Sequence, residues 1–479
     1  MAIIDVGKTN KKLFLFDQQY RIVWERTETL AETVDEDGDP CEDLARLTHW
    51  TRTAVAEVLA LPQFSVQALN ISTYGASLVA INEEGRSFGA LYNYLKPLPP
   101  SLREQFMTHY GPADHLSLAT ASPILDSLNA GLMLYRIKWT KPRFFRRIWY
   151  VLHLPQYLSY LFTAQPLTDL TSLGCHTLLW DFNRQTYHEW VKTEGFVPLM
   201  GSLFPGDRTM PALFSPRNQA DQLLKVGVGL HDSSAALIPY LATFKEPFVL
   251  ISTGTWCISL NPFTAIDGSQ PLLTAEELQY DCLCYMTYQG KPVKASRLFA
   301  GHEHEQQIQR LASHFGVSPD YYKQVRYNPS TMEQLTESPP LSVQGDGMVP
   351  PASMPSPHTS AFGRRVLADF PDYETAYHQL MLDIMAGQLV STVLVMPTGA
   401  DIDQPAIVRI FVDGGFSQNS IYMNLLATAF PQTEVWAALV AQATALGAAL
   451  AIHDDWNPLP RPSNLITLTR YITPKPVPA

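Results

Sequence analysis

Residues 2–10 read Ala2-Ile3-Ile4-Asp5-Val6-Gly7-Lys8-Thr9-Asn10, and residues 13–16 form a second apolar run. Apolar runs of strand length on both sides of a polar, glycine-containing turn predict two strands joined by a tight turn. The same arrangement recurs at residues 247–260, where Ser252-Thr253-Gly254-Thr255 is the turn. The two copies lie much further apart than the roughly 20 to 50 residues of a solenoid repeat, so they predict a duplicated domain architecture.

Each of these turns offers backbone N–H groups and hydroxyls with little side-chain obstruction, which a chain of phosphates needs for hydrogen bonds. Asp5, at the end of the preceding strand, is suited to hold a water of a magnesium ion that bridges phosphates. An ordinary hairpin is the alternative for either turn alone, but two copies and a later Gly-Gly turn weaken that alternative. A P-loop is disfavoured, because Ala2 replaces the first glycine of that motif and a strand follows Thr9 where a helix is required.

The composition excludes several classes of protein. The chain has 479 residues, enough for two or three domains, and 46% of them are hydrophobic, which is typical of a folded globular protein. Its net charge of −11 argues against a nucleic-acid partner. We find no apolar run of about 18 residues and therefore expect no membrane span. Five cysteines, an odd number, do not indicate a disulfide scaffold, so we expect a cytoplasmic protein.

Other segments extend the predicted pattern of strands and helices. Residues 68–74 and 78–81 read as strands on either side of a turn at Gly75-Ala76. Residues 122–160 have mostly helical spacing of their apolar positions. A buried strand at 408–412 runs directly into Asp413-Gly414-Gly415, which supplies the later Gly-Gly turn.

The second half ends in further readable segments. Residues 442–452 read as a helix in which Gly447 would permit the close approach of another backbone or of a flat ligand. We expect a loop at 338–358 and an extended tail at 458–479, because both stretches are rich in proline. The domain junction is expected within residues 239–246, just before the second strand-turn-strand unit.

Asp232 is the candidate catalytic base. It follows the glycine-containing run at 226–230 and precedes Ala235-Ala236, so it lies at a strand-to-helix turn where the helix N-terminus stabilises negative charge. The alternative interpretation is that Asp232 only caps that helix, a position that Asp favours strongly.

Cysteine and histidine side chains that could bind a metal occur at Cys282, Cys284, His302 and His304. Their spacing matches no zinc pattern, and a β context would place both cysteines on the same face of a strand. We therefore do not predict a zinc site.

Four motifs together resemble the FGGY carbohydrate kinase family, within the superfamily that also contains actin, hexokinases and the heat-shock chaperone ATPases. The turn Asp5-Val6-Gly7-Lys8-Thr9 is similar to the family's first phosphate element, and Ser252-Thr253-Gly254-Thr255-Trp256 is similar to its second. Residues 413–419 resemble the adenosine element, and residues 442–449 resemble the family's Ala-Thr-Ala-Leu-Gly-Ala-Ala helix. The resemblance implies an α/β fold of two actin-like, ribonuclease H-like ATPase domains with a cleft between them.

The resemblance also implies where ATP, Mg²⁺ and a small-molecule sugar would bind. Residues 1–243 would form the domain on the sugar and phosphate side, and residues 244–479 the domain on the nucleotide side. Asp232 matches the family's catalytic Asp and would be the general base, while Asp5 would hold the metal. The sugar would contact Gly75, His231 and Asp232. The nucleotide would contact Gly7, Lys8, Thr9, Asn10, Gly254, Thr255, Gly414, Gly415 and Asn419.

The motifs look most like those of the rhamnulokinase and L-fuculokinase branch, so L-rhamnulose or L-fuculose is the expected substrate. Many family members have an aromatic-x-Asp-x-Arg segment after the Gly75 turn, whereas this chain has Tyr92-Asn93-Tyr94-Leu95-Lys96, without the acidic residue. A kinase for xylulose, ribulose or a polyol therefore stays open, as does a catalytically silent ATP- or sugar-binding regulator on the same fold. A homodimer also stays open, because the sequence does not fix the oligomeric state.

Overall fold

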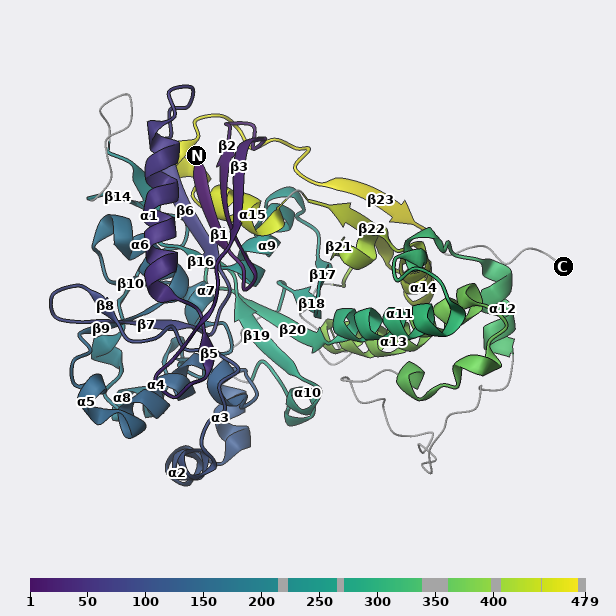
Figure 1. Cartoon of the computed structure of the whole chain (residues 1–479), viewed down its shortest axis with the longest axis horizontal. Helices are drawn as coiled ribbons and strands as arrows, with labels where there is room; N and C mark the ends of the chain where they lie inside the picture. The colour runs from purple at the N-terminus through teal and green to yellow at the C-terminus, as the bar shows by residue number, and fades with distance from the viewer. Residues whose placement is uncertain (214–222, 265–270, 338–360, 398–405, 441, 473–479) are drawn as a thin grey trace.

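The computed structural model describes residues 1–213, 223–264, 271–337, 361–397, 406–440 and 442–472 (Figure 1). Its two largest sheets each have seven strands. The first sheet consists of β14 (Thr209–Pro211), β15 (Lys225–Gly227), β6 (Ala68–Thr73), β1 (Ala2–Val6), β2 (Asn10–Phe16) and β3 (Ile22–Thr29) in spatial order, with β16 (Leu230–His231) also paired to β6. The second sheet consists of β19 (Cys282–Met286), β20 (Pro292–Leu298), β18 (Cys257–Asn261), β17 (Phe248–Thr253), β21 (Arg409–Gly414), β22 (Glu434–Leu439) and β23 (Thr467–Tyr471).

The same five-strand plan is present in both sheets. In the first sheet β1 is antiparallel to β2 and parallel to β6, and in the second β17 is antiparallel to β18 and parallel to β21. Each plan continues with an antiparallel strand on one side, β3 or β20, and a parallel strand on the other, β15 or β22. This repetition confirms the predicted α/β class and the predicted duplication.

Burial explains why the two quoted segments form central strands. Ala2, Ile3, Ile4 and Val6 are almost completely buried, as a strand covered on both faces requires. In β17 the run 248–251 is buried in the same way. Both predicted strand-turn-strand units are therefore confirmed.

Helices α9 (Asp232–Thr243) and α15 (Ala443–Ala451) connect the two halves. Figure 1 shows α15, from the end of the chain, beside α9 and next to β1 and β6, and all of these elements are in contact. At the crossing a Cβ on Gly447 would lie 1.8 Å from the carbonyl oxygen of Ala235. Of the two interpretations of Gly447, close approach of another backbone is therefore the right one. The buried Asn70 of β6 adds a hydrogen bond from Nδ2 to the Ala448 carbonyl oxygen, at 2.8 Å.

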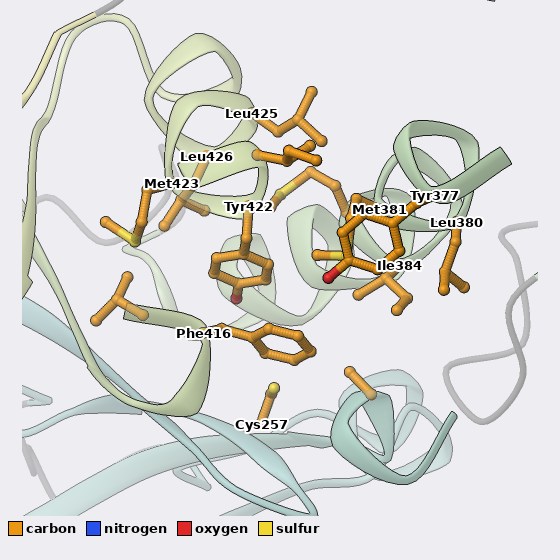
Figure 2. Close-up of a cluster of buried hydrophobic side chains, with 14 of the residues drawn as sticks. Cys257, Tyr377, Leu380, Met381, Ile384, Phe416, Tyr422, Met423, Leu425 and Leu426 are labelled. Atoms are coloured by element: carbon orange, nitrogen blue, oxygen red, sulfur yellow. The ribbon is translucent and has the colours of Figure 1, made fainter. Parts of the chain in front are cut away.

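Helices also cover the sheets. On the first sheet these are α1 (Leu44–Ala60) and α6 (Leu154–Thr163), and on the second α11 (Ala300–Phe315) and α13 (Tyr373–Val395). Of the described helices, α13 alone has the length and apolar composition of a membrane span, and it packs on β18 and β20. Figure 2 shows part of its core contact, where Tyr377 and Met381 face Phe416 and Tyr422, the latter on α14 (Ser420–Ala429).

Two sequence predictions need correction. Residues 150–160 were expected to be helical, but Tyr150–His153 form strand β9, which pairs antiparallel with β7 (Leu78–Ile81). A short apolar run does not distinguish a buried strand from a buried helix, and pairing with β7 decides the outcome here. The expected tail at 458–479 contains β23, which is antiparallel to β22, while residues 473–479 lie outside the described residues. The loop expected at 338–358 also lies outside them.

Shorter elements fill the connections. The remaining α-helices of the described residues are α2 (Pro100–Tyr110), α3 (Ala113–Thr120), α4 (Ala130–Thr140), α5 (Pro142–Phe145), α7 (Leu170–Leu173), α8 (Glu189–Thr193), α10 (Ala275–Gln279), α12 (Pro329–Glu337) and α16 (His453–Trp456). The short strands are β4 (Thr33–Val34), β5 (Pro40–Cys41), β8 (Ser87–Phe88), β10 (Leu167–Thr168), β11 (Trp180–Asp181), β12 (Thr186–Tyr187) and β13 (Ser202–Leu203).

The α9–α15 crossing predicts the effect of adding one methyl group. Gly447→Ala should lower the free energy of unfolding by about 1–3 kcal/mol or more, because the new Cβ overlaps backbone that cannot move aside cheaply. Chemical denaturation measures this loss. Gly363→Ala is the matched control, since its Cβ would meet only the end of Gln307 at 3.4 Å. Equal stability of the two variants would contradict the predicted crossing.

Candidate functional site

The candidate site residues of the N-terminal half lie together at the carboxyl edge of the first sheet. Val6 of β1 lies opposite Thr73 of β6, and both strands run in the same direction. Strand β16 is also parallel to β6 and places His231 opposite Thr73. Asp5, Gly75 and Asp232 therefore all lie at one edge, where α/β sheets commonly bind their ligands.

Asp232 is the first residue of α9, and its side chain is 32% exposed. Its Oδ1 accepts hydrogen bonds from the Ser233 backbone N–H at 2.6 Å and the Ser233 hydroxyl at 3.2 Å, and lies 3.2 Å from His231 Nε2. No donor among the described residues contacts the other oxygen, Oδ2. His231, not Asp232, occupies the N-cap position, so the helix-cap interpretation of Asp232 is wrong. The carboxylate is held at one oxygen and presents the other.

His231 packs against both Gly75 and Cys175. Its Nε2 lies 3.1 Å from Cys175 Sγ, and its backbone N–H donates to Thr171 Oγ1 at 2.9 Å. Burial lowers the pKa of His231, against the opposing effect of the Asp232 and Asp169 carboxylates, so the ring is neutral at pH 7. A Cβ on Gly75 would lie 2.5 Å from Cys175 Sγ and 3.0 Å from His231 Cδ2, so this position requires glycine. The structure thus brings Gly75, His231 and Asp232 together.

Asp5 faces the start of α15. Thr444 donates a hydrogen bond from Oγ1 to Asp5 Oδ2 at 3.0 Å. Burial and, to a smaller extent, the nearby charge of Asp232 raise the pKa of Asp5 to about 6, against the opposing effects of Thr444 and Lys12. Two carboxylates that repel each other at a partly open edge are a favourable place for a hard cation such as Mg²⁺.

The described residues do not form a metal site from protein side chains alone. Within the described ranges there is no group of three or more His, Cys, Asp or Glu side chains arranged to hold a metal ion. Cys282 and Cys284 lie in strand β19 and pack into the same core cluster, so they share one face, as the β context predicted. A magnesium site at Asp5 would therefore take its other ligands from water and phosphates, as Mg²⁺ commonly does.

A buried lysine braces the first turn. Gly7 donates its N–H to the Asn10 carbonyl oxygen at 2.9 Å, which closes the turn. Lys11, only 1% exposed, donates from Nζ to the carbonyl oxygens of Gly7 at 3.2 Å and Lys8 at 3.1 Å, and forms an ion pair with Glu42. Glu42 also accepts a hydrogen bond from the Tyr74 hydroxyl at 2.5 Å. This network connects the turn to the residue before Gly75.

The remaining predicted residues of this turn are less buried. Lys8 forms an ion pair with Glu32 at 3.1 Å, and Thr9 and Asn10 are exposed. Asn10 Oδ1 accepts a hydrogen bond from the Thr29 hydroxyl at 3.1 Å. These side chains leave the backbone of the turn accessible.

The second turn packs closely against the start of α11 and against the end of β21. Gly254 donates its N–H to the Trp256 carbonyl oxygen at 2.8 Å, and Thr255 accepts the His302 N–H at 3.1 Å. A Cβ on Gly301, at the start of α11, would lie 1.8 Å from the Gly254 carbonyl oxygen. Gly414 has a φ of 83°, and its Cβ would lie 1.9 Å from the Thr253 carbonyl oxygen. Only glycine fits at these two contacts.

A cavity of about 550 Å³ opens beside the second turn, and this volume lies in the range of small-molecule sites. It is lined by Thr253, Gly254, Gly301, His304, Tyr322, Lys323, Val325, Arg326, Gly415, Phe416, Gln418, Asn419 and Ser420. Three of the predicted nucleotide residues, Gly254, Gly415 and Asn419, thus share one cavity, whereas Thr255 and Gly414 lie outside its lining. Asn419 also caps α14, because its Oδ1 accepts the backbone N–H groups of Ile421 and Tyr422.

Several residues of the site lie in no recognisable sequence motif, so the sequence analysis did not predict them. Lys11 and Glu42 pair across many residues, so neither position signals burial by itself. Gly301, His304 and Tyr322 enter the cavity from segments with ordinary helical or loop sequence, and His304 was considered only for zinc. The adjacent Lys11 and Lys12 were the one signal that could have indicated a buried lysine. Side chains alternate between the two faces of a strand, so one of the two must point toward the core.

Comparisons with known proteins agree with this architecture. Residues 245–460 match the family model described as carbohydrate kinase FGGY, C-terminal domain. A rhamnulokinase of Halalkalibacterium halodurans is 21% identical over 283 residues, which cover 58% of this chain and 56% of that protein. The chain thus matches about half the length of this curated relative.

Two solved structures are similar over almost the whole chain. A carbohydrate kinase from Novosphingobium aromaticivorans has a TM-score of 0.76 at 22% identity, covering 99% of this chain and 96% of that one. A ligand-bound xylulose kinase from Lactobacillus acidophilus has a TM-score of 0.75 at 14% identity, covering 99% and 94%. They confirm the predicted fold of two actin-like ATPase domains. Residues 245–460 therefore belong to the FGGY carbohydrate kinase family as its C-terminal domain, and the whole chain has the fold of these sugar kinases.

Proposed function

We propose that this protein transfers the terminal phosphoryl group of ATP to a hydroxyl of a sugar, with Asp232 as the general base. The observation that supports this proposal best is the arrangement of two carboxylates, Asp5 and Asp232, at the carboxyl edge of the first sheet. One of them, Asp232, has an oxygen that no donor among the described residues contacts. The division into a sugar domain at residues 1–243 and a nucleotide domain at 244–479 is part of this proposal, and each seven-stranded sheet falls within one of these ranges.

Phosphoryl transfer requires an aligned acceptor, neutralised phosphate charge and a group that accepts the hydroxyl proton. Asp232 Oδ2 would take that proton, while Ser233 and the neutral His231 hold Oδ1 in place. Gly75 would let the sugar approach this edge, because it carries no side chain and its neighbours fill the space behind it.

The nucleotide would be held mainly by the second half. The cavity beside Gly254 and Gly415 would take the nucleoside, and no atom lies within 4 Å of a Cβ built on Gly415. The N–H groups of the turns at residues 7–10 and 254–255 would bind phosphate oxygens. Mg²⁺, when bound, neutralises charge between the phosphates, and Asp5 is the residue that would hold it through water.

The substrate we propose is a ketose such as L-rhamnulose or L-fuculose, in line with the rhamnulokinase similarity. Tyr94 occupies the place where many family members have an acidic residue. It is half-buried, its ring lies 6.1 Å from that of Tyr74, and the Lys8 ammonium lies 5.9 Å from its centroid. An aromatic and cationic wall would bind sugar hydroxyls without a carboxylate. The intact Asp5 and Asp232 speak against a catalytically silent regulator.

An ADP-release assay with Mg²⁺ATP tests the proposed function. The substrates would be L-rhamnulose, L-fuculose, D-xylulose, L-ribulose and glycerol. We expect sugar-dependent ADP release with one or two related ketoses. ATP binding without turnover on any member of an extended ketose and polyol panel would instead support the regulator.

Asp232→Asn should lower kcat roughly 100-fold or more and leave the ATP affinity and the fold unchanged, since it removes the base but keeps the shape of the side chain. Steady-state kinetics and calorimetric titration with ATP check this. Asp114→Asn, at an exposed site in the first turn of α3, is the control and should retain full turnover. Near-normal kcat in Asp232→Asn would rule out its role as base.

Asp5→Asn should change thermal stability in a pH-dependent way when Mg²⁺ is absent. The raised pKa of about 6 means that the folded protein favours the protonated carboxyl, so this contribution is complete below about pH 4 and is lost as the pH rises through 6. Asn mimics the protonated form, so the variant should gain about 3 kcal/mol over wild type at pH 8 and only about 1 kcal/mol at pH 4.5. Calorimetric melting at both pH values measures this, and equal shifts at both would show that Asp5 is not perturbed.

A further inference from the structure

The side chain of Asn419 has a fixed orientation at the edge of the cavity. Its Oδ1 accepts the backbone N–H of Ile421 at 3.0 Å and that of Tyr422 at 3.1 Å. An amide nitrogen in that place could not accept either bond, so the two ends of the amide are assigned by their partners. Nδ2 therefore points to the Tyr377 hydroxyl, to which it donates a hydrogen bond at 2.8 Å.

This orientation decides where the Tyr377 hydroxyl hydrogen goes. The buried hydroxyl accepts from Asn419, and the one acceptor for its own hydrogen among the described residues is His304 Nε2, at 2.9 Å. His304 Nε2 must then carry a lone pair. Burial lowers the pKa of His304 to about 4, so the ring is neutral at pH 7 and its one hydrogen is on Nδ1.

The ring of His304 is also fixed by packing. It is buried, it lines the cavity, and it stands edge-on to Tyr322 at 5.0 Å and to Phe416 at 5.2 Å between centroids. No acceptor among the described residues receives the Nδ1 hydrogen. A histidine ring of fixed tautomer thus lines the cavity that the proposed function assigns to a nucleoside.

We propose that His304 is a nucleoside-binding residue whose Nδ1–H donates a hydrogen bond to an acceptor on the base or ribose, and that Tyr377 and Asn419 are positioning residues that fix its tautomer. This inference rests on the proposed function, since it requires that the cavity binds the nucleoside of ATP. It adds a residue to the nucleotide site that no sequence motif marks.

Calorimetric titration of the full-length protein with ATP and with inorganic tripolyphosphate tests the contact. His304→Ala should weaken ATP binding roughly 3- to 10-fold, the scale of one neutral hydrogen bond, and should leave tripolyphosphate binding unchanged. His304→Asn, which restores a donor near the Nδ1 position, should recover part of the loss. His314→Ala, at an exposed site in the last turn of the same helix, is the control. A further titration with 2′-deoxy-ATP tests whether the 2′-hydroxyl is the acceptor, in which case His304→Ala would no longer matter.

Two outcomes distinguish a failure of this inference from a failure of the proposed function. If wild-type protein does not bind ATP, both the proposed function and the inference fail. If wild type binds ATP and His304→Ala binds it equally well, only the inference fails.

Nitrogen-15 NMR of the histidine rings tests the tautomer without any ligand. The His304 signal, assigned by its loss in His304→Ala, should show hydrogen on Nδ1 in wild type and a mixture of tautomers in Tyr377→Phe, which keeps the ring but removes the hydroxyl. Hydrogen on Nε2 in wild type would overturn the proposal that Asn419 and Tyr377 fix the tautomer of His304.

Discussion

The close crossing of α9 and α15 is the contact on which the rest of this structure depends. Gly447 lets the α15 backbone reach the Ala235 carbonyl oxygen, so a helix from the end of the chain packs beside a helix from its middle. The first residue of α9 is Asp232, and the first turn of α15 contains Thr444, which donates a hydrogen bond to Asp5. The approach of two backbones therefore sets the positions of the residues proposed to bind metal and accept a proton.

The two sheets share a strand plan but carry different chemistry at equivalent places. In the first half the last but one residue of the strand before the glycine turn is Asp5, and in the second half the matching position is Ser252. The first turn lies at an edge with two carboxylates, whereas the second is packed against Gly301 and opens to a cavity. A duplicated scaffold with two carboxylates at one edge and a cavity at the other suits a reaction in which a metal-phosphate group and a nucleoside are held by opposite halves.

The sequence predicted correctly those elements whose conformation depends on a few neighbouring residues. The apolar runs around Gly7 and Gly254, and the small helix around Gly447, were predictable because strand pattern and glycine requirements act over a few residues. Strand β9 was mistaken for helix because its pairing with β7 decides its conformation. The buried Lys11 and the orientation of His304 could not be predicted, since each depends on partners far away in the chain.

The most direct test of the account is a crystal structure of the protein with Mg²⁺ and a non-hydrolysable ATP analogue. We expect the nucleoside in the cavity beside Gly415, with the terminal phosphate and the metal directed toward Asp5 and Asp232. A nucleoside bound outside that cavity, or a terminal phosphate directed away from the two carboxylates, would contradict it.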